Sequence, residues 1–157
     1  MTFTLKKTMS QNGINLLKFL EGEKFTVYLD KGNNPTVGIG HKITPQDNLK
    51  VGDTITPIES GKLLRNDLSY AERAIRTHVL VPLNQNQFDA LTSFIFNVGT
   101  GAFSNSTMLR KLNQYDYSGA LAEFPRWKFV TNRETGIKDE DIVLITRRKY
   151  EADLFNS

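Results

Sequence analysis

Residues 21–41 read EGEKFTVYLDKGNNPTVGIGH, and the periodicity changes at the start of this stretch. Before it, apolar residues recur at three-residue spacing over residues 10–21, which predicts an amphipathic helix that Gly22 ends. From Phe25 apolar and polar residues alternate, and the turn formers of residues 30–35 separate two extended runs. The stretch therefore predicts a helix followed by a small antiparallel ribbon.

A helical remainder is predicted to follow the ribbon. Thr56, Pro57 and Glu59 form the pattern of a capping box with proline at the first helical position, which predicts the start of a long helix. Further helices are predicted from near Asn84 or Asn86 up to a break at residues 99–101, over 107–113, over 118–124 and from about 146 to 155, with a polar loop over 131–139.

The fold class that this order predicts is α+β, mostly helical, in a single domain of residues 1–157. A small β-hairpin lobe is expected over about residues 22–56. A larger helical lobe is expected over about 57–157 together with the N-terminal helix 10–21. A cleft between the two lobes is the default binding site.

The composition excludes several classes of chemistry. The 157 residues include 20 Lys and Arg against 17 Asp and Glu, a net charge of +3, and no cysteine. Disulfides, thiolate metal sites and cysteine nucleophiles are therefore excluded. Since only His41 and His78 are present and lie far apart in sequence, neither a metal site nor another cofactor is expected. The basic residues are interspersed with acids, so nucleic acid is not an expected partner.

No run approaches the roughly 18 consecutive apolar residues of a membrane span. The first residues lack the pattern of a secretory signal, because their charges come after the apolar residues. We therefore expect a protein made in the cytoplasm, without an integral membrane segment.

Carboxylates at the end of the first helix and in the ribbon are the candidates for catalysis. Glu21 lies at a helix C-terminus, where the helix dipole disfavours a negative charge, although Lys18 and Lys24 could offset this. Asp30 follows the first extended run, where it is also an ordinary turn former. Gly38 and Gly40 mark a bulge or a place where a ligand approaches the backbone.

This stretch resembles the catalytic signature of the phage-type lysozymes, glycoside hydrolase family 24. In that family Glu, Asp and Thr are separated by eight and then five residues, and Glu21, Asp30 and Thr36 match both the spacing and the residue types. Segments 82–91, 96–99, 106–113, 126–127 and 147–155 also resemble the family, so the likeness extends from about residue 13 to 155 and suggests an endolysin of a tailed phage or prophage.

The resemblance implies hydrolysis of the β-1,4 bond between N-acetylmuramic acid and N-acetylglucosamine in the glycan strands of peptidoglycan. Glu21 is then the general acid, which apolar surroundings keep protonated, and Asp30 on the wetter hairpin stays ionised. In an inverting reaction Asp30 activates a water that the Thr36 hydroxyl orients. A retaining route through a covalent intermediate stays open.

The resemblance also implies supporting and substrate-binding residues. His41 corresponds to a family histidine that pairs with an aspartate, here Asp67, and a purely structural role is the preferred interpretation. Arg147 or Arg148 would hold Glu21, the alternative being a solvated basic helix face. Three further residues, Phe96, Asn97 and Lys42, correspond to residues that line the sugar cleft in the family. For Phe96 a place in the core is the stronger interpretation, because aromatic residues at helical spacing usually belong to the core.

Two rival functions stay open, and the sequence departs from the family pattern in one segment. A lytic transglycosylase would use Glu21 alone. A noncatalytic wall-binding or membrane-disrupting protein would use the basic residues 147–149 beside apolar residues of the last helix. Many relatives follow Arg126-Trp127 with a short glycine-rich loop, whereas this chain has the longer polar segment 128–141. The first twenty residues lack the apolar anchor that some family members use for export, so an endolysin that waits in the cytoplasm for a holin pore is expected. The enzyme is also expected to be a monomer.

Overall fold

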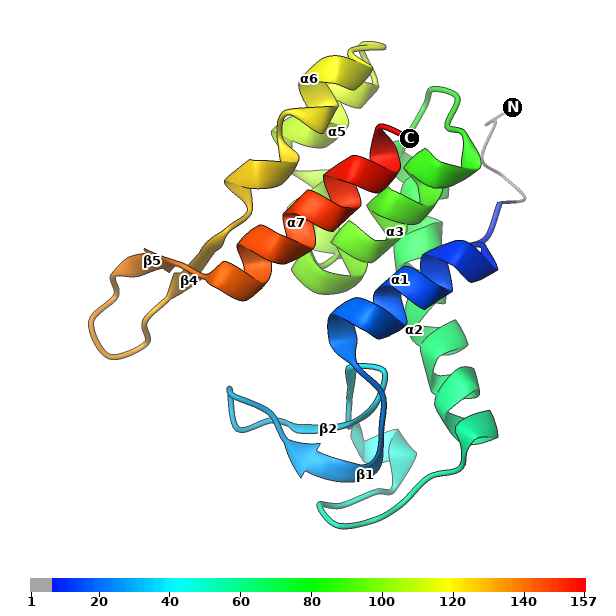
Figure 1. The fold of residues 1–157 in the computed structure, drawn as a ribbon, viewed down its shortest axis with the longest axis vertical. Coiled ribbons are helices and arrows are strands. Elements are labelled where there is room, and N and C mark those ends of the chain that lie inside the picture. Colours follow the sequence, from blue (N-terminus) through cyan, green and yellow to red (C-terminus); the bar gives the residue numbers. More distant parts are fainter. Residues whose placement is uncertain (1–6) are drawn as a thin grey trace. The chain divides into compact units, whose positions relative to one another are not determined.

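The computed structural model describes residues 7–157 and divides the chain into two compact units (Figure 1). The sheet unit comprises Ile14–Tyr70. The helical unit comprises the described residues up to Gly13 together with Ala71–Ser157. Helices dominate and the strands are short and antiparallel, which confirms the predicted α+β class.

The predicted first helix is α1, Gln11–Glu21. Gly22 ends it with φ 74°, and its N–H donates to the carbonyl of Lys18 at 2.8 Å. Only glycine adopts this left-handed conformation readily, which explains its place directly after Glu21.

The predicted ribbon is a three-stranded antiparallel sheet in the order β1 (Lys24–Leu29), β2 (Pro35–Gly38) and β3 (His41–Lys42). The third strand was not predicted, because two residues are too short to show alternation. It pairs Thr36 with Lys42 and Val37 with His41. One face of the sheet is closed by the buried side chains of Val27, Val37 and Ile55.

A one-turn 3₁₀ helix, η1 (Pro45–Asp47), interrupts the polar segment before α2 (Pro57–His78). The predicted capping box is present: the Glu59 N–H donates to Thr56 Oγ1 at 3.1 Å, and the Thr56 N–H donates to the Glu59 carboxylate at 3.2 Å. Two donors at the helix start are thereby satisfied.

The helical unit is built on α3 (Gln85–Val98) and α7 (Ile142–Phe155), which pack side by side. The other elements are α4 (Thr100–Ser104), α5 (Thr107–Leu112), α6 (Tyr117–Leu121), the 3₁₀ turn η2 (Phe124–Arg126), β4 (Phe129–Thr131) and β5 (Lys138–Glu140). Its core is apolar and includes Phe88, Leu91, Phe94, Phe103, Phe124 and Phe155.

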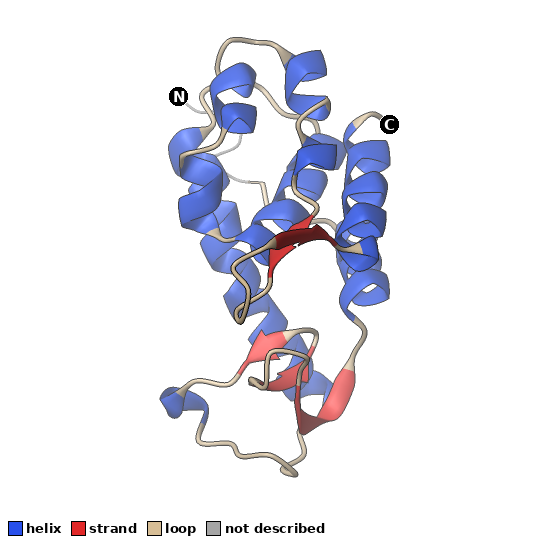
Figure 2. Cartoon of the chain, turned by 90° about the vertical axis from the view of Figure 1, so that its left-hand side faces the viewer, coloured by secondary structure: helices blue, strands red, loops and turns tan. Residues whose placement is uncertain are grey.

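Two predictions in this unit were wrong, and one short helix was missed. Residues 131–139 are not simply a loop, because β4 and β5 pair as an antiparallel hairpin with Thr131 opposite Lys138 (Figure 2). The last helix begins at Ile142 rather than near residue 146, since the Asp141 carboxylate accepts the Leu144 N–H at 3.0 Å as its N-cap. The break expected at residues 99–101 is confirmed, since α3 ends at Val98 with Gly99 as its C-cap, but the short helix α4 that follows was not predicted.

Between residues 7 and 157, no helix combines the length and the apolar character that crossing a bilayer requires.

Candidate active site

The Glu21 side chain lies at the C-terminal end of α1, half-buried, with its carboxyl group against Gly40. A Cβ at residue 40 would lie 2.7 Å from Glu21 Oε2, closer than real Cβ atoms approach. Gly40 also has φ 64°, in the region that favours glycine. Gly40, two residues after the end of β2, therefore makes room for the carboxyl group. The sequence analysis expected a bulge or a ligand there, and the group that approaches the backbone is the Glu21 side chain.

The Asp30 carboxylate lies at the end of β1 and is surrounded by donors. Its Oδ1 accepts the N–H groups of Gly32 at 2.9 Å and Asn34 at 2.8 Å, and the Asn34 side-chain amide at 3.3 Å. Its Oδ2 pairs with the Lys42 ammonium group from β3. Because every one of these partners is a donor, the turn suits an ionised carboxylate in a fixed orientation.

Thr36 is buried in β2, opposite Tyr28 on one side and Lys42 on the other. Its hydroxyl donates to the carbonyl of Asn34 at 2.9 Å. Since that bond uses the hydroxyl proton, the oxygen is left with acceptor capacity, and it can accept a hydrogen bond from a water molecule.

His41 and Asp67 pair as the sequence predicted, with Nδ1 and the carboxylate 2.7 Å apart. A second carboxylate, that of Asp47 in η1, lies 2.9 Å from Nε2 and also accepts the Thr44 N–H. The hydrogen bond to Asp67, followed by that to Asp47, outweighs burial and raises the pKa of His41 to about 9. The charged ring thus joins β3, η1 and α2, which fits the structural role.

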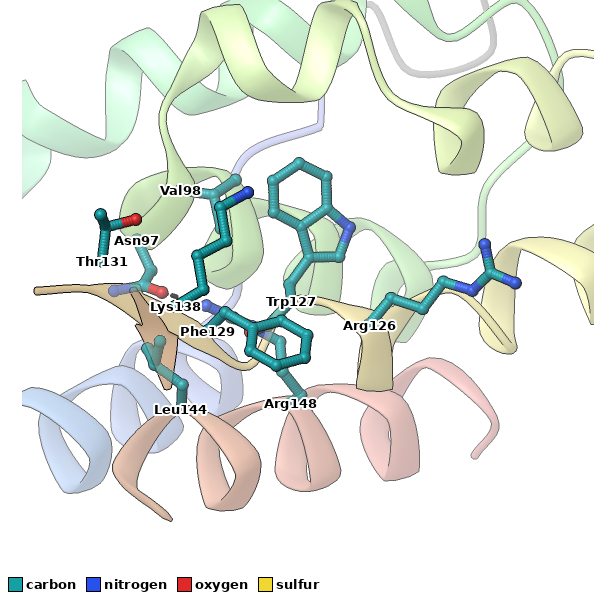
Figure 3. A pocket seen from close by; sticks show the side chains of 9 residues that line it. All are labelled: Asn97, Val98, Arg126, Trp127, Phe129, Thr131, Lys138, Leu144 and Arg148. Atoms are coloured by element: carbon teal, nitrogen blue, oxygen red, sulfur yellow. Dashed lines mark hydrogen bonds between the residues drawn. The ribbon is translucent and has the colours of Figure 1, made fainter. Parts of the chain in front are cut away.

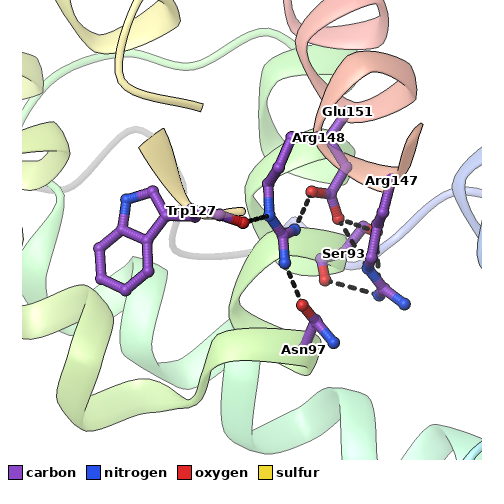
Figure 4. A network of polar contacts seen from close by, with 6 residues as sticks. All are labelled: Ser93, Asn97, Trp127, Arg147, Arg148 and Glu151. Carbon is purple, nitrogen blue, oxygen red and sulfur yellow. Dashed lines mark hydrogen bonds and ion pairs between the residues drawn. The ribbon is translucent and has the colours of Figure 1, made fainter. Parts of the chain in front are cut away.

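Arg147 and Arg148 do not form a solvated basic face, because both are buried in a polar network of the helical unit (Figure 4). The Glu151 carboxylate lies between them. It accepts a hydrogen bond from Arg147 Nε at 3.3 Å and forms an ion pair with Arg148. Arg147 also donates to the Ser93 carbonyl at 3.0 Å, and Ser93 Oγ donates to Glu151 at 2.6 Å.

This burial also weakens the membrane-disrupting alternative. Two of the three basic residues on which it depends are buried with a carboxylate, and Phe155 at the end of the same helix belongs to the core. Lys149 and Tyr150 alone stay exposed of the residues that suggested a basic amphipathic surface.

A pocket of about 510 Å³ lies beside this network in the helical unit (Figure 3). Two aromatic rings, Trp127 and Phe129, lie beside cationic and polar side chains, and the full lining is Asn97, Val98, Arg126, Trp127, Phe129, Thr131, Lys138, Leu144 and Arg148. Asn97, predicted to bind substrate, is therefore exposed at a pocket. Phe96 is half-buried and does not line it.

The structure brings residues that the sequence analysis singled out together in three pairs, all within the sheet unit: Glu21 with Gly40, Asp30 with Lys42, and His41 with Asp67. The sequence analysis missed Asp47 and Glu151. Glu151 is completely buried, and its place one helical turn after both arginines was the available signal. Asp47 carried a signal as the N3 residue of a capping box that starts at Thr44.

Among residues 7–157 no group of three or more His, Asp or Glu side chains is arranged to hold a metal ion. Glu21, Asp30 and Thr36 supply two carboxylic groups and a hydroxyl, and cleavage of a glycosidic bond by acid and base uses a pair of carboxyl groups.

Comparisons with known proteins agree with this chemistry. The phage lysozyme family model matches residues 18–151. An endolysin of Salmonella phage P22 is 47% identical over 150 residues, which cover 95% of this chain and 98% of that protein. A SAR-endolysin of bacteriophage PS119 is 36% identical over 135 residues, which cover 86% of this chain and 75% of that protein.

A solved structure shows the same fold. The endolysin from Escherichia coli O157:H7 phage FAHEc1 superposes with a TM-score of 0.89 at 31% identity, over 96% of this chain and 94% of that one. The chain belongs to the phage lysozyme family and is a muramidase, a glycoside hydrolase that degrades bacterial peptidoglycan.

Proposed function

We propose that Glu21 is the general acid that protonates the leaving oxygen of the glycosidic bond between N-acetylmuramic acid and N-acetylglucosamine. The observation that carries this assignment is the packing of its carboxyl group against Gly40, where no side chain separates the acid from the backbone. A carboxyl group held in this way loses little orientational freedom when it meets the leaving oxygen.

Asp30 is assigned the role of general base, and Thr36 that of orienting the attacking water. Asp30 Oδ1 already accepts three hydrogen bonds and Oδ2 pairs with Lys42, which fixes the carboxylate and disperses its charge. The oxygen atoms of such a carboxylate attack the anomeric carbon only weakly, but they can still accept a proton from water. Thr36, whose hydroxyl proton is committed to Asn34, can accept from the same water.

These roles favour inversion at the anomeric carbon over the retaining route. Digestion of soluble glycan oligomers, followed at once by proton NMR of the new reducing ends, tests the assignment. We expect the α-anomer to form first from the β-1,4 bond, before mutarotation. Initial formation of the β-anomer would instead assign Asp30 as a nucleophile.

Further residues are assigned supporting roles. Lys42 is proposed to bind substrate from its place beside Asp30, and Phe96 and Asn97 to bind substrate from α3. His41 and Asp67 support the sheet that carries Thr36. Arg147 or Arg148 is proposed to hold the Glu21 side chain, in addition to the ion pairs that both make with Glu151.

We propose that the enzyme is made in the host cytoplasm, acts as a monomer and reaches the wall through a holin pore. The likeness to the P22 endolysin, at 47% identity over 150 residues, supports a lysis protein that acts on the cell wall. Expression in cells with and without a holin tests the route, and we expect lysis only with the holin.

A further inference from the structure

Ser60 is a buried polar residue of the sheet unit that binds the segment directly after Glu21. It lies near the start of α2 and is 0% exposed. Its hydroxyl group donates to Glu23 Oε1 at 2.9 Å. Glu23 is the last residue before β1 and lies two positions after Glu21. A buried hydroxyl group on α2 thus holds the short segment that joins α1 to the sheet.

The same hydroxyl group lies against the end of β2. A Cβ at Gly38 would lie 3.1 Å from Ser60 Oγ, and Gly38 has φ 64°, so a glycine here leaves the room that the hydroxyl group needs. Gly38 is also the partner of Lys24, the residue after Glu23, in the pairing of β1 with β2. Ser60 therefore meets the sheet where β1 begins and β2 ends.

The turn between α1 and β1 depends on such a contact, because the residue after Glu21 is a glycine. Gly22 has φ 74°, and no described residue beyond its chain neighbours lies within 4 Å of a Cβ built there. Glycine has more conformational freedom to lose than any other residue. The Gly22 N–H donates to the carbonyl of Lys18, which belongs to α1 itself. The hydrogen bond between Glu23 and Ser60 ties the turn to a different element.

The Glu21 carboxyl group leaves little tolerance for movement of this turn. Its Oε2 would be only 2.7 Å from a Cβ at residue 40, so the group is packed directly on the backbone. A general acid has to lie within hydrogen-bond reach of the oxygen that it protonates. Misplacement by about 1 Å can reduce the rate about a hundredfold. A bond that fixes the chain two residues after Glu21 therefore bears on catalysis.

We infer that Ser60 and Glu23 are positioning residues for the general acid, and that the hydrogen bond between them holds the turn after Glu21 in the conformation that the reaction requires. The inference rests on the proposed function, because it takes Glu21 as the acid. The bond acts through the backbone of residues 21–23, not through contact with the substrate. Its signature is a lower kcat at a nearly constant KM, whereas a purely structural bond would change only the stability.

Four variants separate the hydrogen bond from the charge of Glu23. Ser60→Ala removes the donor, and Glu23→Met removes the acceptor with little change in side-chain length. Glu23→Gln keeps an acceptor oxygen for Ser60 but removes the charge and the exposed ion pair with Lys18, whose atoms lie 3.9 Å apart. The combination of Ser60→Ala with Glu23→Met completes a double-mutant cycle. Thr92→Val is the matched control, since Thr92 is also 0% exposed and its hydroxyl group donates to the Phe88 carbonyl within α3.

Initial rates with soluble glycan oligomers, measured at a temperature where every variant is folded, give kcat and KM. We expect Ser60→Ala and Glu23→Met each to lower kcat about tenfold, with KM within about twofold of wild type. The double variant is expected to be no slower than either single variant, because both remove the same bond. Glu23→Gln and Thr92→Val are expected to keep kcat within about twofold of wild type, since the bond between Ser60 and residue 23 persists in both.

Three results would overturn the inference. The first is a kcat of either single variant equal to that of Thr92→Val. The second is a pair of losses that multiply in the double variant, because independent losses do not come from a shared bond. The third is a loss in Glu23→Gln as large as in Glu23→Met, which would assign the effect to the charge of Glu23 instead of the hydrogen bond.

Glu21→Gln in the same assay separates this inference from the proposed function. A wild-type kcat in Glu21→Gln would refute the general acid and the positioning pair together. A strong loss of kcat in Glu21→Gln, combined with an unchanged kcat in Ser60→Ala, would refute the positioning pair alone.

Discussion

Single residues decide how the carboxyl group of Glu21, the proposed general acid, is placed, and Gly40 is the most direct example. Gly40→Ala is expected to lower the free energy of unfolding by about 1–2 kcal/mol, since φ is 64° there. The added Cβ would also lie 2.7 Å from Glu21 Oε2 and displace it. A displacement of this kind can reduce kcat about a hundredfold. Urea unfolding and turnover of soluble oligomers measure the two effects.

Gly136→Ala provides the control for Gly40, because φ is 71° at Gly136 and nothing lies within 4 Å of the added Cβ. A similar loss of stability with nearly full activity is expected for it. Equal activity of the two alanine variants would show that the space beside Glu21 is unimportant.

His41 makes stability depend on pH in the alkaline range. Its pKa is raised from 6.5 to about 9, first by the hydrogen bond to Asp67. A group whose pKa is raised on folding stabilises the fold fully below about pH 6.5, and that contribution is lost as the pH rises through about 9. Asp67→Asn is therefore expected to cost about 2 kcal/mol near pH 6, allowing for partial solvent screening, and clearly less above about pH 10.

Chemical unfolding of Asp67→Asn and of Asp153→Asn, an exposed aspartate on α7, at several pH values tests this dependence. Asp153→Asn is expected to change the free energy of unfolding by less than about 0.5 kcal/mol at every pH. A cost of Asp67→Asn that stays constant from pH 6 to 10 would contradict the assignment of a charged His41.

At the scale of elements, the buried carboxylate of Glu151 joins α3 to α7. Glu151→Gln leaves the guanidinium groups of Arg147 and Arg148 buried without their carboxylate, and we expect a loss of about 3–5 kcal/mol. Glu140→Gln is the control, since Glu140 is 55% exposed and its pair with Lys128 is expected to contribute less than about 1 kcal/mol. Similar losses in urea unfolding of the two variants would refute the structural role of the network.

Elements with strong local signals were predictable from the sequence, and elements formed by pairing at a distance were not. The capping box at Thr56 and the N-cap at Asn84 each consist of interactions inside a segment of four residues. The sequence alone therefore shows where these helices begin. By contrast, β4 and β5 are exposed on both faces, so their residues show no alternation of apolar and polar types. The first turn of α7 contains the β-branched Ile142, Val143 and Ile145, which have a weak helix propensity, and the start depends on Asp141 instead.

For the whole molecule, the residue types and spacing of Glu21, Asp30 and Thr36 were readable in the sequence because they lie in one short stretch. Their surroundings were not, since they depend on contacts between distant residues. Asn97 meets Arg148 across 51 positions, and Lys42 reaches Asp30 only because β3 adds a third strand. Hydropathy patterns carry no information on such polar pairs.

Glu21→Gln tests the central claim most directly, with the exposed Glu134→Gln as its control. Permeabilised Gram-negative cells are treated with each protein, clearing is followed, and the released fragments are analysed by mass spectrometry. We expect wild type and Glu134→Gln to clear the cells and release fragments with reducing N-acetylmuramic acid ends, and Glu21→Gln to be slower by about a hundredfold or more. Clearing by Glu21→Gln at the wild-type rate, or fragments with 1,6-anhydro ends, would contradict an acid-catalysed hydrolysis at Glu21.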